Sequence, residues 1–233
     1  FEATYRAIGQ DINQRIDFRQ LDPNYRIYYH DGTHIDLYSN MALLAQEMVK
    51  IDPKAPEMLF RFVGESAKKY ALGMEFVDRN YDHIIELANA GAGIKLLQTN
   101  AHQNLYRQVA SFFNNNDKLA KAFSFHSMFL GLSPFNALAM YSLITYADLA
   151  LGMWFPMGGI YRIIEDMVQL AGEMGVTLRT NASVAEILVE GQRARGVRLE
   201  SGEVVEADLV VSNADLPYTY TNLIAPQHRR EYT

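Results

Sequence analysis

The spacing of apolar residues changes once along this chain of 233 residues. Up to Gly175 the apolar positions recur mostly every three or four residues, which is typical of amphipathic helices. After Gly175 they alternate with polar positions over short runs, which is typical of strands. The pattern therefore predicts an α/β protein that is mostly helical in its first part and rich in strands in its last part.

One hairpin interrupts the helical part. Residues 25–38 read YRIYYHDGTHIDLY, in which two alternating aromatic and β-branched runs flank Asp31-Gly32. An Asp-Gly pair between such runs is a strong short-range signal for a β-hairpin. Ser39 or Asn40 can then cap a helix that ends near Asp52-Pro53.

Further helices are predicted from the same three-to-four spacing and from Gly or Pro at their ends. They cover Pro56 to about Phe76, Tyr81–Ala90, Leu105–Ala122 with a turn at 114–116, and a helix opened by Gly158-Gly159. The strands predicted after Gly175 are Val176–Arg179, Val184–Glu190, Arg195–Glu200, Glu203–Glu206 and Ala207–Ser212.

The segment from Ala122 to Tyr161 is long and apolar, and Asp148 is its one charged residue. Glycines, prolines and Asn136 interrupt it, whereas a membrane-spanning helix needs about 20 apolar residues without a break. The segment therefore predicts two buried helices that line an apolar cavity or face a membrane surface. An apolar wall of this kind indicates a protein that binds a hydrophobic ligand.

Composition narrows the classes of function. A net charge of −6 argues against nucleic acid as a partner, because phosphate binding requires an excess of Lys and Arg. The absence of cysteine excludes disulfides and thiolate chemistry, and the six histidines are dispersed, so no metal site is expected. The first residues lack an apolar signal core, and both ends look cut, which predicts a fragment of a longer protein.

Two polar residues in the apolar run are weak catalytic candidates. Asp148 is a lone carboxylate among apolar residues, a setting that raises a pKa and is common for functional acids. Its alternative is a structural carboxylate at a helix end that meets an Arg or a backbone amide. His126 is either catalytic or a hydrogen-bonded core histidine. No catalytic residue is assigned from these patterns alone.

Longer strings of residues carry a family resemblance. AFSFHSMFLGLSPF, and WFPMGGIYRIIEDMVQLAGEMGV with the strand-rich residues that follow it through NADLPYTYTNLI, resemble the bacterial-type phytoene desaturases. These are FAD-dependent carotenoid desaturases of the amine-oxidase-like flavoprotein superfamily. Nearly the whole chain takes part in the resemblance, which implies a partial flavoprotein fold of the α/β class.

The resemblance implies an FAD cofactor and assigns residues to it. Val184 contacts the adenine through its backbone, and Asn213-Ala214 follows a sheet strand beside the diphosphate. Gly158-Gly159 allows close passage of the backbone on the flavin side. The implied substrate is a hydrophobic polyene, lined by Phe123, Phe125, Phe129, Trp154 and Phe155.

The resemblance also implies an organisation in two parts. Residues 1–157 form a mostly helical substrate-binding and membrane-associated part, and residues 158–233 form part of the FAD-binding domain. The Gly-x-Gly-x-x-Gly segment and the second flavin segment of the family have no counterpart in this sequence. We therefore expect the isolated chain to lack activity.

The implied activity is the desaturation of a phytoene-like C40 or C30 precursor by a cytoplasmic enzyme bound peripherally to the inner face of the membrane. Two alternatives stay open at this point. One is a carotene isomerase of the same fold, and the other is a cofactor-free module that binds isoprenoids or lipids. The sequence does not specify the number of desaturation steps, the electron acceptor or the oligomeric state.

Overall fold

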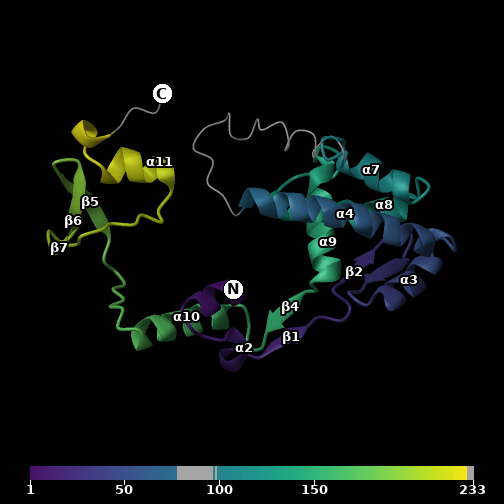
Figure 1. Ribbon diagram of the computed structural model, residues 1–233, viewed down its shortest axis with the longest axis horizontal. Coiled ribbons are helices and arrows are strands. Elements are labelled where there is room, and N and C mark those ends of the chain that lie inside the picture. Colours follow the sequence, from purple (N-terminus) through teal and green to yellow (C-terminus); the bar gives the residue numbers. More distant parts are fainter. Residues whose placement is uncertain (78–96, 98, 230–233) are drawn as a thin grey trace. The chain divides into compact units, whose positions relative to one another are not determined.

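The computed structural model describes residues 1–77, 97 and 99–229, and the chain divides into two compact units (Figure 1). The first unit is Phe1–Ile164 and the second is Glu165–Thr233. The helix predicted at Tyr81–Ala90 lies outside the described residues. The predicted boundary between residues 157 and 158 stays a prediction.

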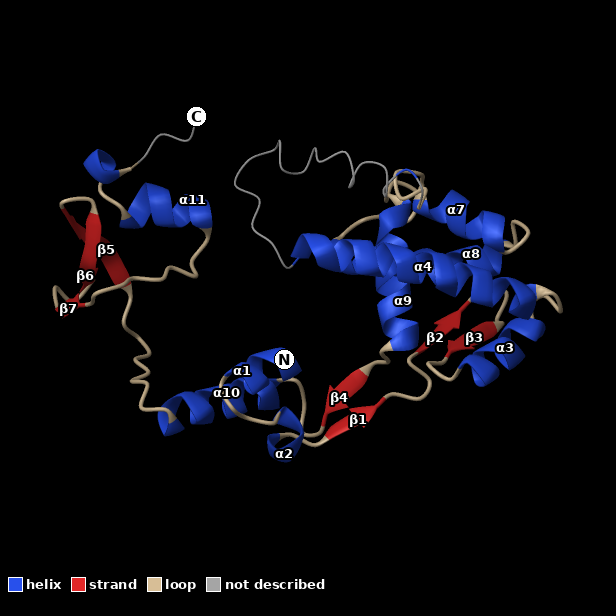
Figure 2. Cartoon of the chain, viewed as in Figure 1, coloured by secondary structure: helices blue, strands red, loops and turns tan. Residues whose placement is uncertain are grey.

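Helices dominate the first unit, and Figure 2 distinguishes them from the two short strand pairs. Among the described residues of this unit, the α-helices that precede residue 160 are α1 (Glu2–Ala7), α2 (Ile12–Arg15), α3 (Met41–Val49), α4 (Ala55–Val77), α7 (Leu105–Phe112), α8 (Asp117–Ser124) and α9 (Ser142–Ala150). The strands are β1 (Phe18–Gln20), β2 (Tyr25–Tyr28), β3 (His34–Leu37) and β4 (Trp154–Pro156).

The predicted hairpin is confirmed. Strand β2 pairs antiparallel with β3, with Tyr25 opposite Leu37 and Tyr28 opposite His34. The turn is closed by the Thr33 carbonyl, which accepts a hydrogen bond from the Tyr29 amide at 2.8 Å. The Asp31 carboxylate accepts from the Thr33 amide and hydroxyl, as expected of an Asp that stabilises a tight turn.

Asparagine side chains begin three helices of this unit. Asn40 accepts hydrogen bonds from the Ala42 and Leu43 amides at the start of α3. Asn104 and Asn116 do the same for α7 and α8. These bonds satisfy amides that have no partner within the helix, which explains why the chain turns into a helix at these positions. Asn116 also explains the predicted break between the two halves of segment 105–122.

The core of the first unit lies between α4, the hairpin and the neighbouring helices, which surround it in Figure 1. Its fully buried apolar side chains come from elements far apart in the sequence, and include Ile35, Leu37, Leu44, Met48, Leu59, Leu105, Val109, Phe113, Leu119, Phe123 and Leu149. Within the described residues, no helix is long and apolar enough to cross a membrane.

The prediction of two buried helices in the apolar segment is wrong in part. Only α9 is an α-helix between residues 125 and 160; the rest contains the 3₁₀ helices η1 (Phe125–Leu130) and η2 (Ala139–Tyr141), then β4. Gly131 ends η1 with a left-handed φ of 70°. The glycines and prolines that argued against a membrane span also keep the segment from forming two regular helices.

The helix α10 (Tyr161–Glu173) leads from the first unit into the second. It begins after Gly158 and Gly159, whose φ values of 92° and 101° are outside the helical range. The second unit then forms an antiparallel sheet in the order β5-β6-β7, from β5 (Val184–Glu190), β6 (Arg193–Leu199) and β7 (Val204–Glu206). Its last elements are α11 (Leu216–Tyr218), the π-helical turn η3 (Thr219–Leu223) and the 3₁₀ turn η4 (Pro226–His228).

Two predicted strands of the second unit are wrong. Neither Val176–Arg179 nor Ala207–Ser212 forms a strand; the Ala207 amide still donates to the Arg195 carbonyl of β6 at 2.9 Å, but the ladder between β6 and β7 ends at Glu206. The apolar side chain of Val211 is 82% exposed. Alternation alone does not make a strand, because its backbone groups also need a neighbouring strand as a hydrogen-bonding partner.

Candidate functional site

Three polar side chains from three elements meet inside the first unit. His126 lies on η1, Asp148 on α9 and Tyr25 on β2. The Asp148 Oδ2 atom is 3.1 Å from His126 Nε2, and it accepts a hydrogen bond from the Tyr25 hydroxyl at 3.4 Å. The His126 side chain is 1% exposed and that of Asp148 is 13% exposed. The two catalytic candidates of the sequence are therefore partners of one another.

The contact between His126 and Asp148 is a close approach of two atoms and not a well-aligned hydrogen bond. The distance from Nε2 to Oδ2 is 3.1 Å, yet Nε2 has no hydrogen-bond partner of acceptable angle. Distance governs a charge–charge attraction, whereas a hydrogen bond also requires direction.

The second ring nitrogen of His126 is also engaged by α9. His126 Nδ1 lies 3.2 Å from the Thr145 hydroxyl, which in turn donates to the Phe123 carbonyl at 3.1 Å. Thr145 and Asp148 are three residues apart and therefore lie on one face of α9. Both ring nitrogens thus contact the same helix, which fixes the orientation of the ring.

The backbone of Asp148 is held separately from its carboxylate. Asn24 donates from Nδ2 to the Asp148 carbonyl at 2.8 Å and to the Ser39 hydroxyl at 2.9 Å. Burial first, and then the Asp148 carboxylate, raise the pKa of Tyr25 well above its usual range. Tyr25 therefore stays protonated and acts as the donor to Asp148.

Aromatic rings surround His126. Phe125 is tilted against it with ring centroids 4.1 Å apart, and Phe129 and Tyr25 meet it edge-on at 5.9 and 5.7 Å. Phe129 is 56% exposed, so this ring cluster extends from the interior to the surface. The predicted substrate-lining residue Phe123 has a different setting: it is fully buried and stacked on Phe113 at 4.9 Å.

The other two predicted substrate-lining residues lie on β4. Trp154 and Phe155 are both exposed, and they pair with Gln20 and Arg19 of β1. The Trp154 indole donates to the Leu151 carbonyl at 3.1 Å, which holds the ring over the end of α9. Trp154 and Phe155 are thus exposed apolar side chains, as Phe129 is. The substrate-lining roles of all five predicted residues stay predictions.

The glycine pair assigned to the flavin side has the backbone that such a role needs. Gly159 has a left-handed φ, and no atom lies within 4 Å of the position that a Cβ would occupy. A Cβ on Gly158 would touch the side chain of Arg162. The open space at Gly159 accommodates close approach of a cofactor to the backbone before α10.

The remaining flavin candidates lie in the second unit. Val184 is the first residue of β5, opposite Leu199, and β5 is an edge strand of the sheet formed by the described residues. One row of its backbone groups is therefore open to an adenine on that edge. Asn213 and Ala214 are exposed in the segment before α11 and do not follow a strand, which corrects their predicted setting.

One buried cation was missed by sequence reasoning. Lys69 of α4 is 1% exposed, and its Nζ donates to the Gln108 side chain and, at 3.2 Å, to the Ser142 hydroxyl. Burial lowers its pKa to about 8. The sequence did carry a signal for this burial: Lys69 is spaced from Phe62 and Leu72 so that all three lie on the buried face of α4.

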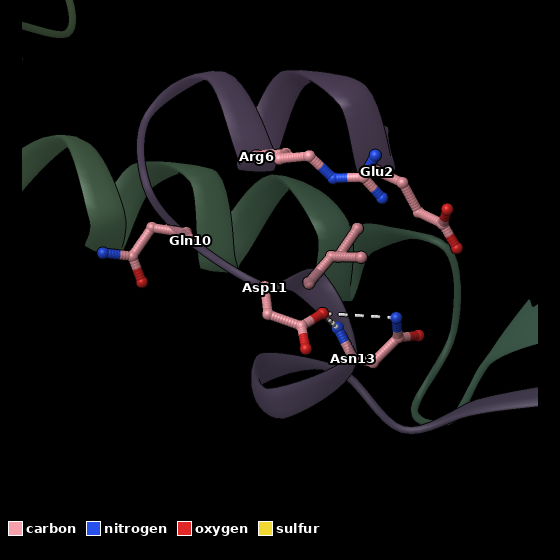
Figure 3. A pocket seen from close by; sticks show the side chains of 6 residues that line it. Glu2, Arg6, Gln10, Asp11 and Asn13 are labelled. Carbon is pink, nitrogen blue, oxygen red and sulfur yellow. Dashed lines mark hydrogen bonds between the residues drawn. The ribbon is translucent and has the colours of Figure 1, made fainter.

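A polar depression of about 350 Å³ lies beside α1 and α2 (Figure 3). Asp11 there accepts hydrogen bonds from the backbone and side chain of Asn13, as the figure shows. The bond from the Asn13 backbone amide caps the short α2 helix. No group of three or more potential metal ligands gathers in the described part of the chain.

The chain as a whole, not only its candidate site, resembles proteins of known class. A family model described as flavin containing amine oxidoreductase matches residues 3–232. The architecture and this match define an α/β flavoprotein. The chain belongs to the flavin containing amine oxidoreductase family, since the match spans nearly all of its residues.

Within this family, the chain is similar to curated proteins named as phytoene desaturases. The zeta-carotene-forming phytoene desaturase of Myxococcus xanthus is 36% identical over 228 residues, which are 97% of this chain and 44% of that protein. The phytoene desaturase of Neurospora crassa is 34% identical and is matched over 39% of its length by 96% of this chain. The neurosporene-forming phytoene desaturase of Cereibacter sphaeroides is 33% identical over 98% of this chain and 44% of its own length. The chain thus spans less than half the length of these relatives.

Proposed function

We propose that this chain is part of an FAD-dependent carotenoid desaturase that acts on a phytoene-like C40 or C30 precursor. The observation that carries the proposal is the 36% identity to a phytoene desaturase over 97% of the chain. The relatives named above are all desaturases, which favours this function over a carotene isomerase. The family match favours it over a cofactor-free lipid-binding module.

The residues assigned to FAD fit the cofactor in kind. Gly159 offers an open backbone position in a left-handed conformation, and β5 offers an unpaired edge at Val184. Asn213 and Ala214 are both exposed. We assign Gly158-Gly159 to the flavin side, Val184 to the adenine and Asn213-Ala214 to the diphosphate.

Each desaturation removes two hydrogens from neighbouring carbons and leaves a C=C bond. Bound FAD supplies the acceptor for the hydride, and a proton leaves from the adjacent carbon. This chain's own task is to bind the hydrocarbon, hold it in place and exclude water. His126 and Asp148 are engaged with each other, so we assign neither as the acceptor of that proton.

Segment 122–161 exposes many apolar side chains that are suited to this task. They are Met128, Phe129, Leu130, Phe135, Leu138, Leu151, Trp154, Phe155, Met157 and Ile160. We propose that they bind the polyene and attach the protein peripherally to the inner face of the membrane, where such a substrate dissolves. Sedimentation with liposomes tests the attachment; unchanged binding after Phe129→Ser and Trp154→Ser together would exclude these residues from it.

The test of function uses the protein at its full natural length, purified and mixed with phytoene in liposomes. A desaturase shows a flavin spectrum and yields products whose absorbance moves to longer wavelength as the conjugated system lengthens. An isomerase yields almost no such movement. A lipid-binding module binds phytoene but carries no flavin, and either of these last two results overturns the proposal.

The flavin assignment has its own test in Gly159→Val. A branched residue is strained at a φ of 101°, and it fills the space that we assign to the cofactor. We expect at least tenfold weaker flavin retention, which corresponds to about 1.4 kcal/mol. Gly9→Val is the matched control, because Gly9 also has a positive φ and open space but lies after α1. Equal flavin retention in both variants would remove Gly159 from the cofactor site.

A further inference from the structure

Segment 127–138 of the first unit exposes a group of large apolar side chains, and we call it the apolar platform. The exposed side chains are Met128, Phe129, Leu130, Leu132, Phe135 and Leu138, and all of them except Leu132 are more than half exposed. The platform contains no Asp, Glu, Lys, Arg or His. Exposed apolar side chains gathered in this way mark a surface that binds a partner.

The backbone of the platform is bonded to the start of α7. The first amides of any helix have no hydrogen-bond partner within the helix. In α7 the Leu105 amide donates to the Ala137 carbonyl at 2.8 Å, and the Tyr106 amide donates to the Pro134 carbonyl at 3.1 Å. The platform and the helix start therefore satisfy each other's backbone groups, which gives the platform a defined conformation.

Asn104 joins the platform to α7 through both ends of its side-chain amide. Its Oδ1 atom accepts a hydrogen bond from the Arg107 amide at 3.0 Å, which caps the helix. Its Nδ2 atom donates to the Phe135 carbonyl in the platform. The backbone of Asn104 also forms an isolated antiparallel bridge with Leu138. One residue thus caps the helix and holds the platform.

Contacts at other points of the platform make its support rigid. The Ser127 hydroxyl donates to the Leu132 carbonyl at 3.0 Å, and the Leu132 amide donates to the Ser127 carbonyl at 3.2 Å. The ring of Phe135 packs on Tyr106 with centroids 4.7 Å apart, and the Tyr106 hydroxyl donates to Asp117 at 2.6 Å. A surface held in this way loses little conformational entropy when a partner binds.

The exposure and the charge of the platform indicate which partner fits it. A groove for a single hydrocarbon chain encloses its ligand between walls, whereas Met128, Phe129 and Phe135 are 64%, 56% and 55% exposed. The hydrocarbon region of a bilayer covers a protruding surface of this kind at once. Because the platform carries no cationic side chain, its binding gains nothing from anionic headgroups.

We propose that the apolar platform inserts into the hydrocarbon region of the bilayer irrespective of lipid charge, and that Asn104 is the positioning residue that holds it ready for insertion. The proposal rests on the proposed function in one respect, because the inserted platform gives the enzyme access to a substrate dissolved in the membrane. Insertion itself is a property of the folded protein and is measured without turnover.

The dependence on lipid charge is tested by flotation of the full-length protein with two kinds of vesicle. One kind is phosphatidylcholine alone, and the other also contains phosphatidylglycerol. We expect the two affinities to agree within about twofold and to persist in about 0.5 M salt. An affinity that rises steeply with phosphatidylglycerol and falls with salt overturns insertion irrespective of charge.

The platform is tested by replacing two of its side chains together, as Phe135→Ser with Leu138→Ser. We expect binding to phosphatidylcholine vesicles to weaken about tenfold or more, because less apolar surface enters the bilayer. Phe60→Ser is the matched control, since Phe60 is a ring on α4 that is 64% exposed. Equal vesicle affinity of the platform variant and the control overturns insertion through this segment.

The role of Asn104 is tested with Asn104→Ser. Serine keeps an oxygen that caps α7 but lacks the amide that donates to the Phe135 carbonyl. We expect faster hydrogen exchange of the platform amides in the free protein, unchanged exchange in α7, and vesicle binding weakened about threefold. Asn116→Ser is the control, because Asn116 caps α8 by accepting from the Leu119 amide.

Unchanged platform exchange or unchanged vesicle affinity in Asn104→Ser overturns the positioning role. Loss of exchange protection in α7 instead of the platform also overturns it, because that is the effect of a lost helix cap alone. If Asn104→Ser does not fold, Asn104→Asp takes its place, since Asp caps helices as well as Asn does and also lacks the donor. Asn116→Asp is then the control.

The two proposals fail in different ways. If the full-length wild-type protein converts no phytoene, the proposed function is wrong, and vesicle binding still decides the role of the platform. If wild type is active, we expect Asn104→Ser to raise KM for phytoene in liposomes with kcat changed by less than about twofold. An active wild type with the same KM and vesicle affinity as Asn104→Ser means that only the positioning role is wrong.

Discussion

Asn24 and Asp148 are 124 residues apart in the sequence, and the side-chain amide of Asn24 donates a hydrogen bond to the Asp148 carbonyl at 2.8 Å. Asn24 precedes the hairpin, whereas Asp148 lies near the end of α9. The bond therefore ties the hairpin to the helix that also holds His126. Asn24 is buried, so its amide has no access to water as a substitute partner.

Replacing this amide should weaken the first unit. Asn24→Ala removes the bonds to the Asp148 carbonyl and to Ser39, and leaves the carbonyl with the longer bond from the Ser39 hydroxyl at 3.4 Å. We expect the free energy of unfolding to fall by about 1–3 kcal/mol. Urea unfolding measures it, and Asn13→Ala, at an exposed site, is the control. Equal midpoints for the two variants would contradict the role of Asn24.

Lys69 should make the stability of the first unit depend on pH in the alkaline range. Burial lowers its pKa from 10.5 to about 8, so between these values the unfolded chain binds more protons than the folded one. The free energy of unfolding should therefore rise with pH across this range, by up to about 3 kcal/mol relative to a variant without the amine. Below pH 8 both states are protonated and the difference is constant.

Lys69→Met is the variant for this measurement. In urea unfolding from neutral pH to about pH 10.5, the free energy of unfolding of wild type should rise relative to that of Lys69→Met. The comparison isolates Lys69, because tyrosines and other groups titrate equally in both proteins. Lys68→Met, which removes an exposed lysine paired with Glu65, should stay parallel to wild type. A constant difference between wild type and Lys69→Met over the range speaks against a buried ammonium.

The contact between Arg26 and Asp36 should make the stability of the first unit depend on pH in the acid range. Arg26 donates to both Asp36 oxygens, at 2.6 and 2.7 Å, and this hydrogen bonding lowers the pKa of the buried carboxyl below its usual 3.8. The stabilisation is present above pH 3.8 and is lost as pH falls. Arg26→Met should destabilise the protein at neutral pH, because it leaves the Asp36 carboxylate, which is 4% exposed, without its guanidinium partner.

The difference between wild type and Arg26→Met should shrink as the pH falls below about 4, since Asp36 becomes neutral in both. Denaturant unfolding at several acid pH values measures the trend. Arg19→Met removes a solvent-exposed pair with Asp17 and should show little effect at any pH. A difference for Arg26→Met that does not vary with pH would rule out the ion pair as its cause.

Gly196 should be irreplaceable in the sheet of the second unit. It has a φ of 151°, and a Cβ there would overlap the backbone carbonyl of Val205 in the neighbouring strand. We expect Gly196→Ala to destabilise this sheet by about 2 kcal/mol or more. Gly172→Ala, in α10 with open space around it, should be neutral or slightly stabilising. Hydrogen exchange of the β6 amides compares the two, and equal protection would refute the close approach.

Local features of the fold could be predicted from the sequence. The hairpin follows from Asp31-Gly32 between alternating runs, the helix α4 from its three-to-four spacing, and β5 from a run whose predicted bounds, Val184–Glu190, are those observed. Each depends on residues that are close together in the chain. The capping of α3 by Asn40 also depends only on neighbouring residues.

The sequence by itself determined the class of the fold, the hairpin and its neighbouring helices, and the membership in a flavoprotein family, because these depend on local spacing and on the order of residues. Only the tertiary structure decided which polar residues meet: Asp148 pairs with His126 and Tyr25, neither of which is the arginine or backbone amide that its position suggested. It also decided that Ala207–Ser212 is not a strand and that Lys69 is buried. These outcomes depend on hydrogen-bonding partners and packing supplied by distant parts of the chain, which no local pattern specifies.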